Sequence, residues 1–414
     1  MFLITLLGVN QLLLLASFVL ALPADTLAAQ GGPGVVFTPA HHPVSAPERA
    51  GMRSGELQEV VRRLAVAVAG GVFPGAAVAA GRGDRVVLEQ GVGRLSWSRQ
   101  AAAADPDLTL YDLASLTKVI ATTTAVMLLV EDGKLRLDDP VADYLPNFRG
   151  RFRNDGALRV TIRDLLTHTS GLPSGSLARG PTEMETLALL IMTTPTLLAP
   201  GRAVRYSDVG FILLWEAAEE AAGEPLFRLL DRRVFAPLGL GSFTFSPGEA
   251  CARCAPSAIL DDGRLLKGVV HDPTARRLGG VAGSAGLFGS VHDVGRFAAM
   301  LLGGGELDGV RVLGEETVEY FTRRQPGAGT RALGWDTPDS FGRGAAGMEV
   351  SAKSFGHTGF TGTSLWIDPA RGTWVVLLTN HTYEPRRRFG MQELRRSIHD
   401  LVARSALLVA PLRY

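Results

Sequence analysis

The order in which strand-like and helix-like segments follow one another constrains the fold of this 414-residue chain more than any other feature. Near the N-terminus, residues 75–80 and 85–90 flank a glycine-rich turn and predict a β-hairpin. The strand pattern returns only after Met348, in residues 363–368 and 373–380, which a four-residue turn separates. Helical patterns fill the middle. One antiparallel sheet built from both chain ends is the simplest architecture for that order. We therefore predict an α+β fold, its sheet covered by helices and carrying an inserted helical subdomain.

Several helices can be placed from their apolar spacing and their end signals. Residues 56–68 and 389–409 have apolar side chains at helical spacing, and we expect these helices to cover the sheet. A third helix, over 211–222, ends at Gly223. Three more helix starts carry a hydroxyl residue with an acidic residue three positions later, which is the pattern of a capping box. They are Thr161 with Asp164, Thr182 with Glu185, and Ser290 with Asp293.

Ser115 and Lys118 lie three residues apart at the start of the most apolar predicted helix, which runs to Val130. Side chains at that spacing share one helix face, so the hydroxyl and the amine can meet. A serine hydroxyl becomes a nucleophile when a base takes its proton. Burial lowers the pKa of a lysine because it disfavours the charged form. The pair therefore predicts an activated serine, and the alternative is a helix cap beside a lysine that reaches the surface.

The scarcity of lysine favours the first interpretation. Only four of the 42 lysine and arginine residues are lysines, namely Lys118, Lys134, Lys267 and Lys353. Arginine stays protonated in proteins, whereas lysine can give up its proton. A lysine inside an apolar helix of so arginine-rich a chain is therefore expected to serve as a base.

Two later motifs can complete such a site. Tyr206 lies in a loop just before a predicted helix, where its hydroxyl can relay a proton between Ser115 and a leaving group. Residues 355–362 place His357 and Thr358 among glycines, which let a backbone approach a ligand and direct N–H groups at it. Each motif also has an ordinary explanation: a boundary aromatic in the first case, a glycine-rich turn between strands in the second.

The three motifs, in this order, resemble the serine β-lactamase and penicillin-binding-protein superfamily. They are Ser-x-x-Lys at Ser115, Tyr-Ser-Asp at Tyr206, and His-Thr-Gly at His357. Residues 165–173 and 280–288 are similar to that family too, and the likeness covers roughly residues 57–402. It is strongest to the class C β-lactamase-related branch, which includes D-alanyl-D-alanine carboxypeptidases and esterases. The resemblance implies a β-lactamase/transpeptidase-like fold.

The resemblance also implies a role for each matching residue. Ser115 would be the nucleophile, Lys118 its base, and Tyr206 the group that shares proton transfer and protonates the leaving group. The backbone N–H groups of Ser115 and Phe360 would form the oxyanion hole. No metal or organic cofactor is implied, and nothing in the sequence asks for one.

The third motif would bind the substrate through His357, Thr358 and Gly359, which would face its carboxylate or an equivalent group. Two positions depart from the family's pattern. Asp208 stands where β-lactamases usually carry asparagine, and an ionised carboxylate only accepts hydrogen bonds whereas an amide can also donate. His357 stands where lysine is usual, which weakens the fixed positive charge at neutral pH. Both departures argue against a β-lactamase proper.

The sequence therefore predicts a serine hydrolase that forms an acyl-serine intermediate with an ester or a D-amino-acid amide, either esterase-like or like a cell-wall D,D-peptidase. The alternatives are a β-lactamase proper and a catalytically silent homologue that binds peptidoglycan or a protein. The expected partner is a small molecule or a cell-wall peptide. A net charge of +1 gives no footprint for nucleic acid. The sequence is silent on oligomeric state.

No metal site is predicted. The pairs His271–Asp272 and His292–Asp293 lack the i, i+4 ligand spacing of zinc helices. Cys251 and Cys254 form a single C-x-x-C, whereas a structural zinc site needs four ligands. A local disulfide and two free thiols are both compatible with that pair.

The N-terminus predicts export. Residues 2–22 carry no charge, and small residues follow up to Ala29, as in a secretory signal. An uncleaved membrane anchor is the alternative, because the run is about long enough to span a bilayer. The protein is then expected to be periplasmic or secreted, or held at the membrane by its N-terminus. The predicted organisation is a signal peptide or anchor over 1–29, a flexible spacer over 30–53, and a catalytic domain over 54–405, with an α/β part (54–118 and 310–405) and a mainly helical part (119–309).

Overall fold

The computed structural model describes residues 34–148, 160–176, 178–341, 344–387 and 390–406. The predicted signal peptide or anchor, and the first residues of the predicted spacer, lie outside the described residues. Within the described ranges, no helix is both long and apolar enough to cross a membrane.

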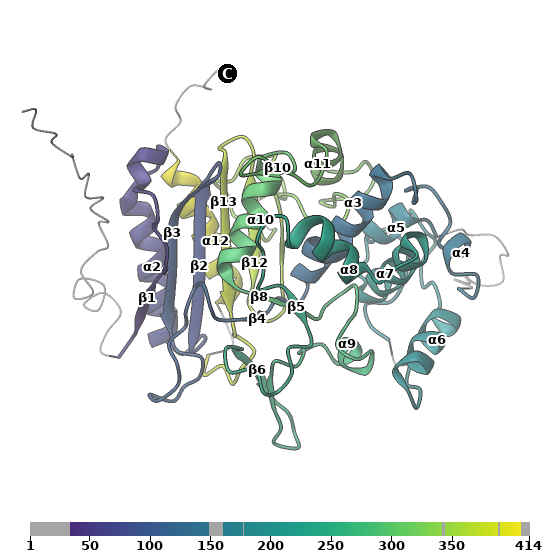
Figure 1. The fold of residues 1–414 in the computed structure, drawn as a ribbon, viewed down its shortest axis with the longest axis horizontal. Helices are drawn as coiled ribbons and strands as arrows, with labels where there is room; N and C mark the ends of the chain where they lie inside the picture. The colour runs from purple at the N-terminus through teal and green to yellow at the C-terminus, as the bar shows by residue number, and fades with distance from the viewer. Residues whose placement is uncertain (1–33, 149–159, 177, 342–343, 388–389, 407–414) are drawn as a thin grey trace, which may run out of the picture.

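One six-stranded antiparallel sheet is formed from both ends of the described chain, in the order β1-β3-β2-β13-β12-β11 (Figure 1). Its strands are β1 (Phe37–Pro39), β2 (Gly75–Arg82), β3 (Arg85–Gly93), β11 (Phe355–Thr358), β12 (Ser364–Asp368) and β13 (Thr373–Thr379). The two ends of the chain meet where β2 pairs with β13, from Ala76 opposite Thr379 to Arg82 opposite Thr373. The predicted α+β fold is confirmed.

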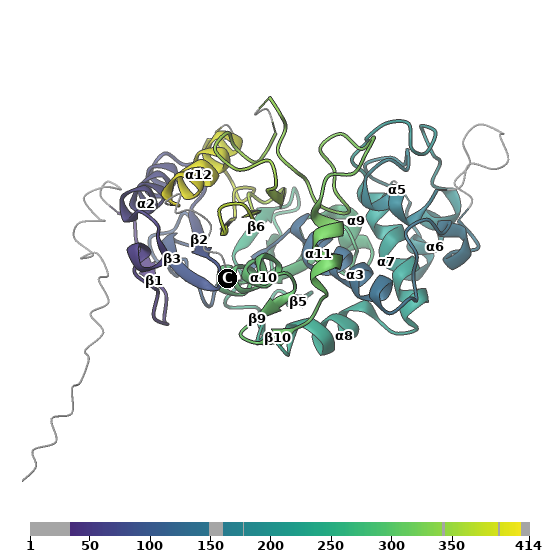
Figure 2. The same ribbon diagram turned by 90° about the horizontal axis from the view of Figure 1, so that it is seen from above.

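Three long helices cover the sheet: α2 (Ser54–Ala69), α10 (Val291–Leu302) and α12 (Met391–Ser405). Val78 of β2 and Leu377 of β13 pack in one core with α2 and α12, whereas Ala79 and Val376 pack in a second core with α10. This alternation is what a strand buried on both faces requires. Figure 2 shows α2 and α12 side by side on the same face of the sheet.

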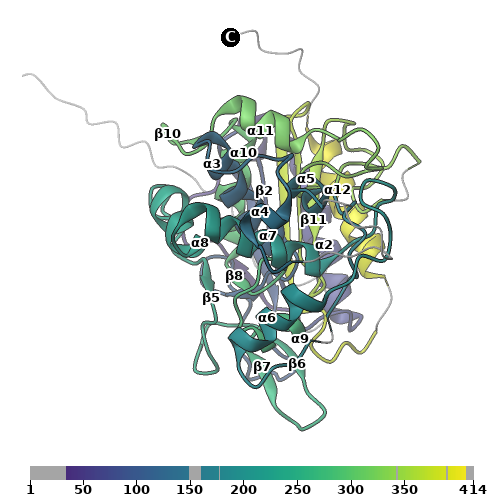
Figure 3. The same cartoon turned by 90° about the vertical axis from the view of Figure 1, so that its right-hand side faces the viewer.

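Beyond α10 lies a mainly helical part. Its elements are η2 (Lys118–Thr123), α3 (Thr124–Glu131), α4 (Val141–Tyr144), α5 (Ile162–Leu166), α6 (Glu183–Thr193), α7 (Asp208–Ala222), α8 (Leu226–Leu230), η3 (Asp231–Phe235) and α9 (Pro273–Arg277). The helix α7 is central, because it contacts α3, α4, α5 and α8. Figure 3 views the molecule from this end, with α4, α6 and α7 in front of the sheet.

Short strands and one further helix link the two parts. They are β4 (Tyr111–Asp112), β5 (Thr244–Phe245) and β8 (Leu287–Gly289) in one small sheet, the pairs β6 (Pro256–Ile259) with β7 (Leu265–Lys267) and β9 (Glu306–Leu307) with β10 (Val310–Arg311), and α11 (Glu315–Thr322). In the connection between β5 and β6, Cys251 and Cys254 are joined as a disulfide.

Two predicted boundaries need correction. The range 119–309 for the helical part is too long, because α10 lies on the sheet, where its apolar face packs against β2 and β13. The flexible spacer over 30–53 is wrong for its described part, since β1 pairs with the edge strand β3 and a 3₁₀ turn, η1 (Pro47–Ala50), follows. Val35 and Phe37 pack against the core under α2, and a flexible segment would leave them in water.

The helix starts were predicted with one error. Capping boxes are present at Thr161 and Thr182, with both hydrogen bonds formed. Ser290 also accepts from the Asp293 N–H, but the carboxylate of Asp293 accepts from the Ser242 N–H at 2.7 Å instead of turning back to the cap. Asp293 therefore ties α10 to the loop before β5.

Candidate active site

The chain enters the candidate site through β4 and a strained turn. Ala114 has a φ of 49°, in a region that side chains rarely adopt, and its N–H donates to the Asp112 carboxylate at 2.9 Å. Asp112 also accepts from the His271 N–H at 2.7 Å, and burial raises the pKa of this carboxyl to about 6. The turn leaves Ser115 only partly buried, three residues ahead of Lys118, where the π-helical turn η2 begins. Turns of that kind are rare and recur at functional sites.

Two predicted catalytic groups meet at the hydroxyl oxygen of Ser115. The Nζ atom of Lys118 lies 3.1 Å from Ser115 Oγ, and the Tyr206 hydroxyl lies 2.9 Å from it. Tyr206 comes from the loop before α7, 91 positions further along the chain than Ser115. An amine and a phenol at hydrogen-bonding distance are the groups needed to move a proton off and onto a serine oxygen.

Lys118 is fully buried and paired. Besides Ser115, its ammonium donates to the Asp208 carboxylate at 2.6 Å and to the main-chain oxygen of Ser284 at 2.9 Å. Burial alone would lower the pKa of Lys118, but the neighbouring acidic groups Tyr206 and Asp208 outweigh it and hold that pKa above its usual value. The prediction of a lowered lysine pKa is therefore wrong. Asp208 itself is about one-third exposed, with a side-chain exposure of 31%.

His168 fixes the loop that carries Tyr206. The rings of His168 and Tyr206 lie 4.4 Å apart between centroids, and Nδ1 of His168 accepts from the Ser207 N–H at 3.1 Å. The Arg205 N–H donates to the main-chain oxygen of His168 at 2.7 Å. Burial holds the pKa of His168 well below its ordinary value, so the ring is neutral and accepts at Nδ1.

The turn after β11 approaches the nucleophile closely. A Cβ on Gly359 would lie 2.7 Å from the main-chain oxygen of Leu113 and 3.3 Å from Ala114 Cβ. Thr363 Oγ1 donates to that same Leu113 oxygen at 3.1 Å. Phe360 follows Gly359 directly, so this contact brings its backbone beside the turn that carries Ser115.

Two main-chain donors at this contact are free. Within the described ranges, the N–H groups of Ser115 and Phe360 donate to no protein acceptor. Two unoccupied N–H groups on neighbouring turns are the donors that an oxyanion hole requires. The Phe360 side chain is 73% exposed and stacks on His271 with ring centroids 5.3 Å apart, so it forms part of the rim of the site.

His357 lies in the site as a neutral group. It is buried, its Nδ1 lies 2.8 Å from the main-chain oxygen of Thr358, and burial lowers its pKa to about 3. Thr358 beside it is partly exposed. His357 therefore carries no positive charge at neutral pH, whereas the sequence suggested a weak one. One nearby cation is Arg331, whose guanidinium lies 5.5 Å from the centroid of the Tyr206 ring.

Sequence reasoning missed two arginines at the site. Arg331 lies over Tyr206, and Arg395 of α12 donates to the main-chain oxygens of Gly359 and Thr363 at 2.5 and 2.8 Å. Burial lowers the pKa of Arg395 to about 10, yet the guanidinium stays charged at neutral pH and braces the turn. In a chain with so many arginines, neither residue carries a local signal that would distinguish it.

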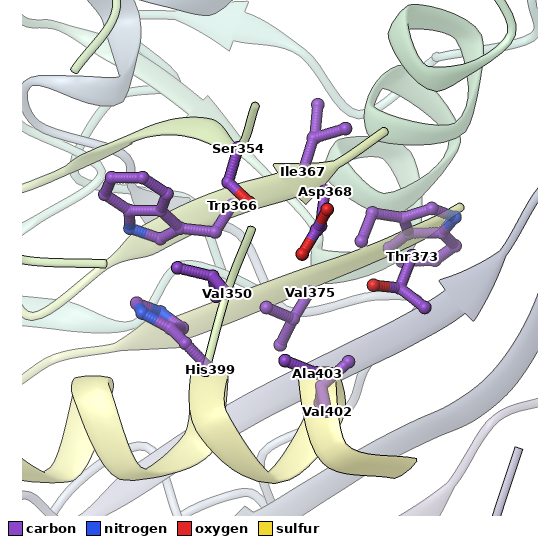
Figure 4. A pocket seen from close by; sticks show the side chains of 11 residues that line it. Val350, Ser354, Trp366, Ile367, Asp368, Thr373, Val375, His399, Val402 and Ala403 are labelled. Carbon is purple, nitrogen blue, oxygen red and sulfur yellow. The ribbon is translucent and has the colours of Figure 1, made fainter. Parts of the chain in front are cut away.

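A small pocket lies elsewhere, on the face of the sheet that α12 covers (Figure 4). Trp366 and His399 line it, with Val375 and Val402. His399 is buried there, 3.1 Å from Ser364 Oγ, and burial lowers its pKa to about 3. None of the candidate catalytic residues lines this pocket.

Comparison with known proteins decides the family. The model of the Beta-lactamase family matches residues 60–400. The chain belongs to the beta-lactamase family. The membership, together with relatives that carry a carboxypeptidase name, identifies it as a serine hydrolase.

A relative agrees with that assignment, and two solved structures agree with the fold. A protein of Salmonella agona strain SL483, provisionally named D-alanyl-D-alanine carboxypeptidase, is 32% identical over 308 residues, covering 67% of this chain and 70% of its own. Two solved structures share the fold at a TM-score of 0.69. EstCE1, a hydrolase with promiscuous acyltransferase activity, is 24% identical and covers 84% of this chain and 99% of its own. A penicillin-binding-protein homologue from Caulobacter crescentus is 21% identical and covers 90% and 100%.

Proposed function

We propose that this beta-lactamase family member hydrolyses carboxylic esters through an acyl intermediate on Ser115. The observation that carries the proposal is the meeting of Lys118 Nζ and the Tyr206 hydroxyl at Ser115 Oγ, at 3.1 and 2.9 Å. Both partners come from separate elements and converge on one partly exposed oxygen. An ordinary helix cap would need neither of them.

The proton route starts from the ion pair. Because the Asp208 carboxylate at 2.6 Å holds Lys118 protonated, we propose that the reactive form is the one in which Lys118 has released this proton to solvent and can take the proton of Ser115. Ser115 Oγ attacks the ester carbonyl carbon. Tyr206 donates its proton to the departing alkoxide and is reprotonated by Lys118, and water then hydrolyses the acyl-serine by the reverse relay.

The N–H groups of Ser115 and Phe360 would stabilise the oxyanion that forms at the carbonyl oxygen. The close contact of Gly359 with Leu113 supports this role, because it sets the distance between the two turns that carry these N–H groups. Arg395 holds the second turn in place through its main-chain oxygens. Preorganised donors of this kind act only as charge develops, so they raise the rate of acylation.

Asp208 and His357 support an ester over a β-lactam or a peptide amide. The Asp208 carboxylate is engaged with Lys118 and only accepts hydrogen bonds, so it cannot donate to a substrate amide carbonyl. His357 is neutral and therefore offers no fixed charge to a substrate carboxylate. Ester hydrolysis requires neither a donor to an amide carbonyl nor a charge for a carboxylate, since the reacting carbonyl needs only the nucleophile and the oxyanion donors.

A second candidate is removal of a C-terminal D-alanine from a cell-wall peptide. The provisional carboxypeptidase name of the Salmonella relative favours it. Arg331 offers the necessary cation: it lies over Tyr206, and its own ion pair with Asp336 is long, at 4.0 Å. In this case, Arg331 would take the place that a lysine of the third motif has in β-lactamases.

Turnover of two substrates separates the candidates. The wild type, Ser115→Ala and the surface control Ser98→Ala would be assayed for p-nitrophenol release from p-nitrophenyl acetate and for D-alanine release from diacetyl-Lys-D-Ala-D-Ala. We expect ester turnover in the wild type and in Ser98→Ala, and none above background in Ser115→Ala. D-alanine release that exceeds ester turnover would replace the ester proposal with the second candidate. Ester turnover that survives Ser115→Ala would overturn both.

We further propose that the enzyme acts outside the cytoplasm, on a small molecule or a cell-wall peptide. The apolar N-terminal segment supports export. The disulfide between Cys251 and Cys254 fits an oxidising compartment.

A further inference from the structure

Two histidines and two carboxylates from four separate segments converge outside the candidate active site. His42 follows β1, Glu89 lies on β3, Asp107 lies in the loop before β4, and His292 lies in the first turn of α10. Each offers one ligand atom, and these atoms all lie within 4.8 Å of one another. The catalytic proposal uses none of them.

Glu89 is the unusual member of this cluster. Its side chain is 1% exposed, and its nearest partners are the imidazoles of His42 and His292. Within the described ranges, no lysine or arginine forms an ion pair with it. A buried carboxylate is costly unless a cation or several hydrogen bonds compensate it. The two neighbouring imidazoles are groups that commonly bind metal ions, so a bound cation is one way to compensate the charge of Glu89.

The distances match those around a small tetrahedral ion. Glu89 Oε2 lies 3.5 Å from His42 Nε2 and 3.4 Å from His292 Nδ1. Metal–ligand bonds of about 2.0–2.1 Å at a tetrahedral zinc separate neighbouring ligand atoms by about 3.3 Å. The same gaps are long for hydrogen bonds to a carboxylate, which prefer about 2.7–2.9 Å.

His42 is oriented as a metal-binding histidine is. Its Nδ1 lies 2.9 Å from Asp107 Oδ1, while its Nε2 is buried and makes no hydrogen bond with any described residue. Metal-bound histidines commonly donate their second N–H to a carboxylate, which fixes the tautomer and aims the other nitrogen at the ion. Asp107 is held in turn by the His41 N–H at 2.9 Å.

We propose that His42, Glu89 and His292 bind a divalent transition-metal ion, with zinc preferred, and that Asp107 positions His42. Two imidazole nitrogens and one carboxylate suit zinc, whereas calcium and magnesium prefer oxygen ligands alone. A water molecule completes the coordination, because the two carboxylate oxygens of Asp107 are already engaged with His42 Nδ1 and the His41 N–H. The ion would join the segment after β1 to the sheet and to α10, so its role is structural. The proposal does not depend on the hydrolase activity.

The test uses the untagged full-length protein, stripped with a chelator and dialysed against micromolar zinc. We expect about one zinc per chain by plasma mass spectrometry, and visible absorption bands of four-coordinate cobalt when cobalt(II) replaces zinc. The variants H42Q and H292Q should each weaken binding at least tenfold, and the double variant should abolish it. H41Q is the matched control, because His41 is 53% exposed, pairs with Asp105 and lies outside the proposed ligand set. It should bind zinc as the wild type does.

Two results would overturn the metal site. The first is no stoichiometric zinc in the wild type, which would leave Glu89 compensated by protonated His292, whose pKa the Glu89 hydrogen bond raises. The second is full binding by the H42Q/H292Q double variant. A rise in Tm with zinc in wild type and H41Q, absent in the double variant, gives an independent readout. Circular dichroism at equal concentration confirms that each variant is folded.

Discussion

Gly359→Ala tests how the two oxyanion donors are brought together. A Cβ at Gly359 would lie 2.0 Å from Thr363 Oγ1 and 2.7 Å from the Leu113 oxygen, both closer than real Cβ contacts allow. These two atoms are hydrogen-bonded to each other at 3.1 Å, so the added methyl would separate them. The turn that carries Phe360 must then move away from the turn that carries Ser115.

The expected loss follows from that separation. Removing one donor of an oxyanion hole costs about 10²–10³ in kcat, or about 3–4 kcal/mol of transition-state stabilisation. Overpacking a tight contact costs about 1–3 kcal/mol of folding free energy. For a catalytic domain of roughly 350 residues, that corresponds to a fall in Tm of about 1–4 °C. The variant should therefore stay folded and lose most of its activity.

The assay measures kcat/KM for p-nitrophenyl acetate beside the thermal melt. Gly241→Ala is the matched control, because a Cβ there would meet nothing within 4 Å and should change neither quantity. A folded Gly359→Ala protein with kcat/KM within threefold of the wild type would refute the reasoning. It would show that the close approach at Gly359 does not place the Phe360 N–H.

Three further substitutions probe the proton route. Lys118→Arg keeps the charge but removes a group that can give up its proton, so acylation of Ser115 should be abolished in a stopped-flow burst assay. Asp208→Asn removes a charge that raises the pKa of Lys118; that pKa should fall, and the acid limb of the kcat/KM profile should move to lower pH. An unmoved limb would count against Lys118 as the base. Tyr206→Phe should lower kcat by about 10²–10⁴, the range of lost general acid catalysis, with a smaller change in KM.

The sheet could be predicted because its signals are local. The β2–β3 hairpin, the strands after Met348 and the capping boxes at Thr161 and Thr182 all depend on residues a few positions apart. The strand β1 escaped prediction because three residues cannot show alternation, and it exists only through its pairing with β3. The amphipathic spacing of α10 shows that one face is buried, but not that the sheet buries it.

In the candidate site, too, features that depend on local motifs were predicted, whereas features that depend on contacts between distant residues were not. Ser115, Lys118 and Tyr206 were predicted from motifs, and the structure brings them together. The raised pKa of Lys118 was not predicted, because it depends on contact with Asp208 at a separation of 90 positions. The proposed zinc ligands show the same limit, since Glu89 and His292 are 203 positions apart and no ligand spacing links them.

The most direct test of the catalytic proposal is the mass of the intact protein after reaction with a fluorophosphonate and, separately, with penicillin. Wild type and Ser115→Ala would be compared at equal folded concentration. The account predicts one phosphonyl adduct on the wild type, none on Ser115→Ala, and little or no penicillin adduct on either. A stable penicillin adduct lost in Ser115→Ala would shift the assignment to the D-alanine-removing candidate. A wild type that gains no adduct, or an adduct that persists in Ser115→Ala, would contradict the claim that Ser115 is the nucleophile.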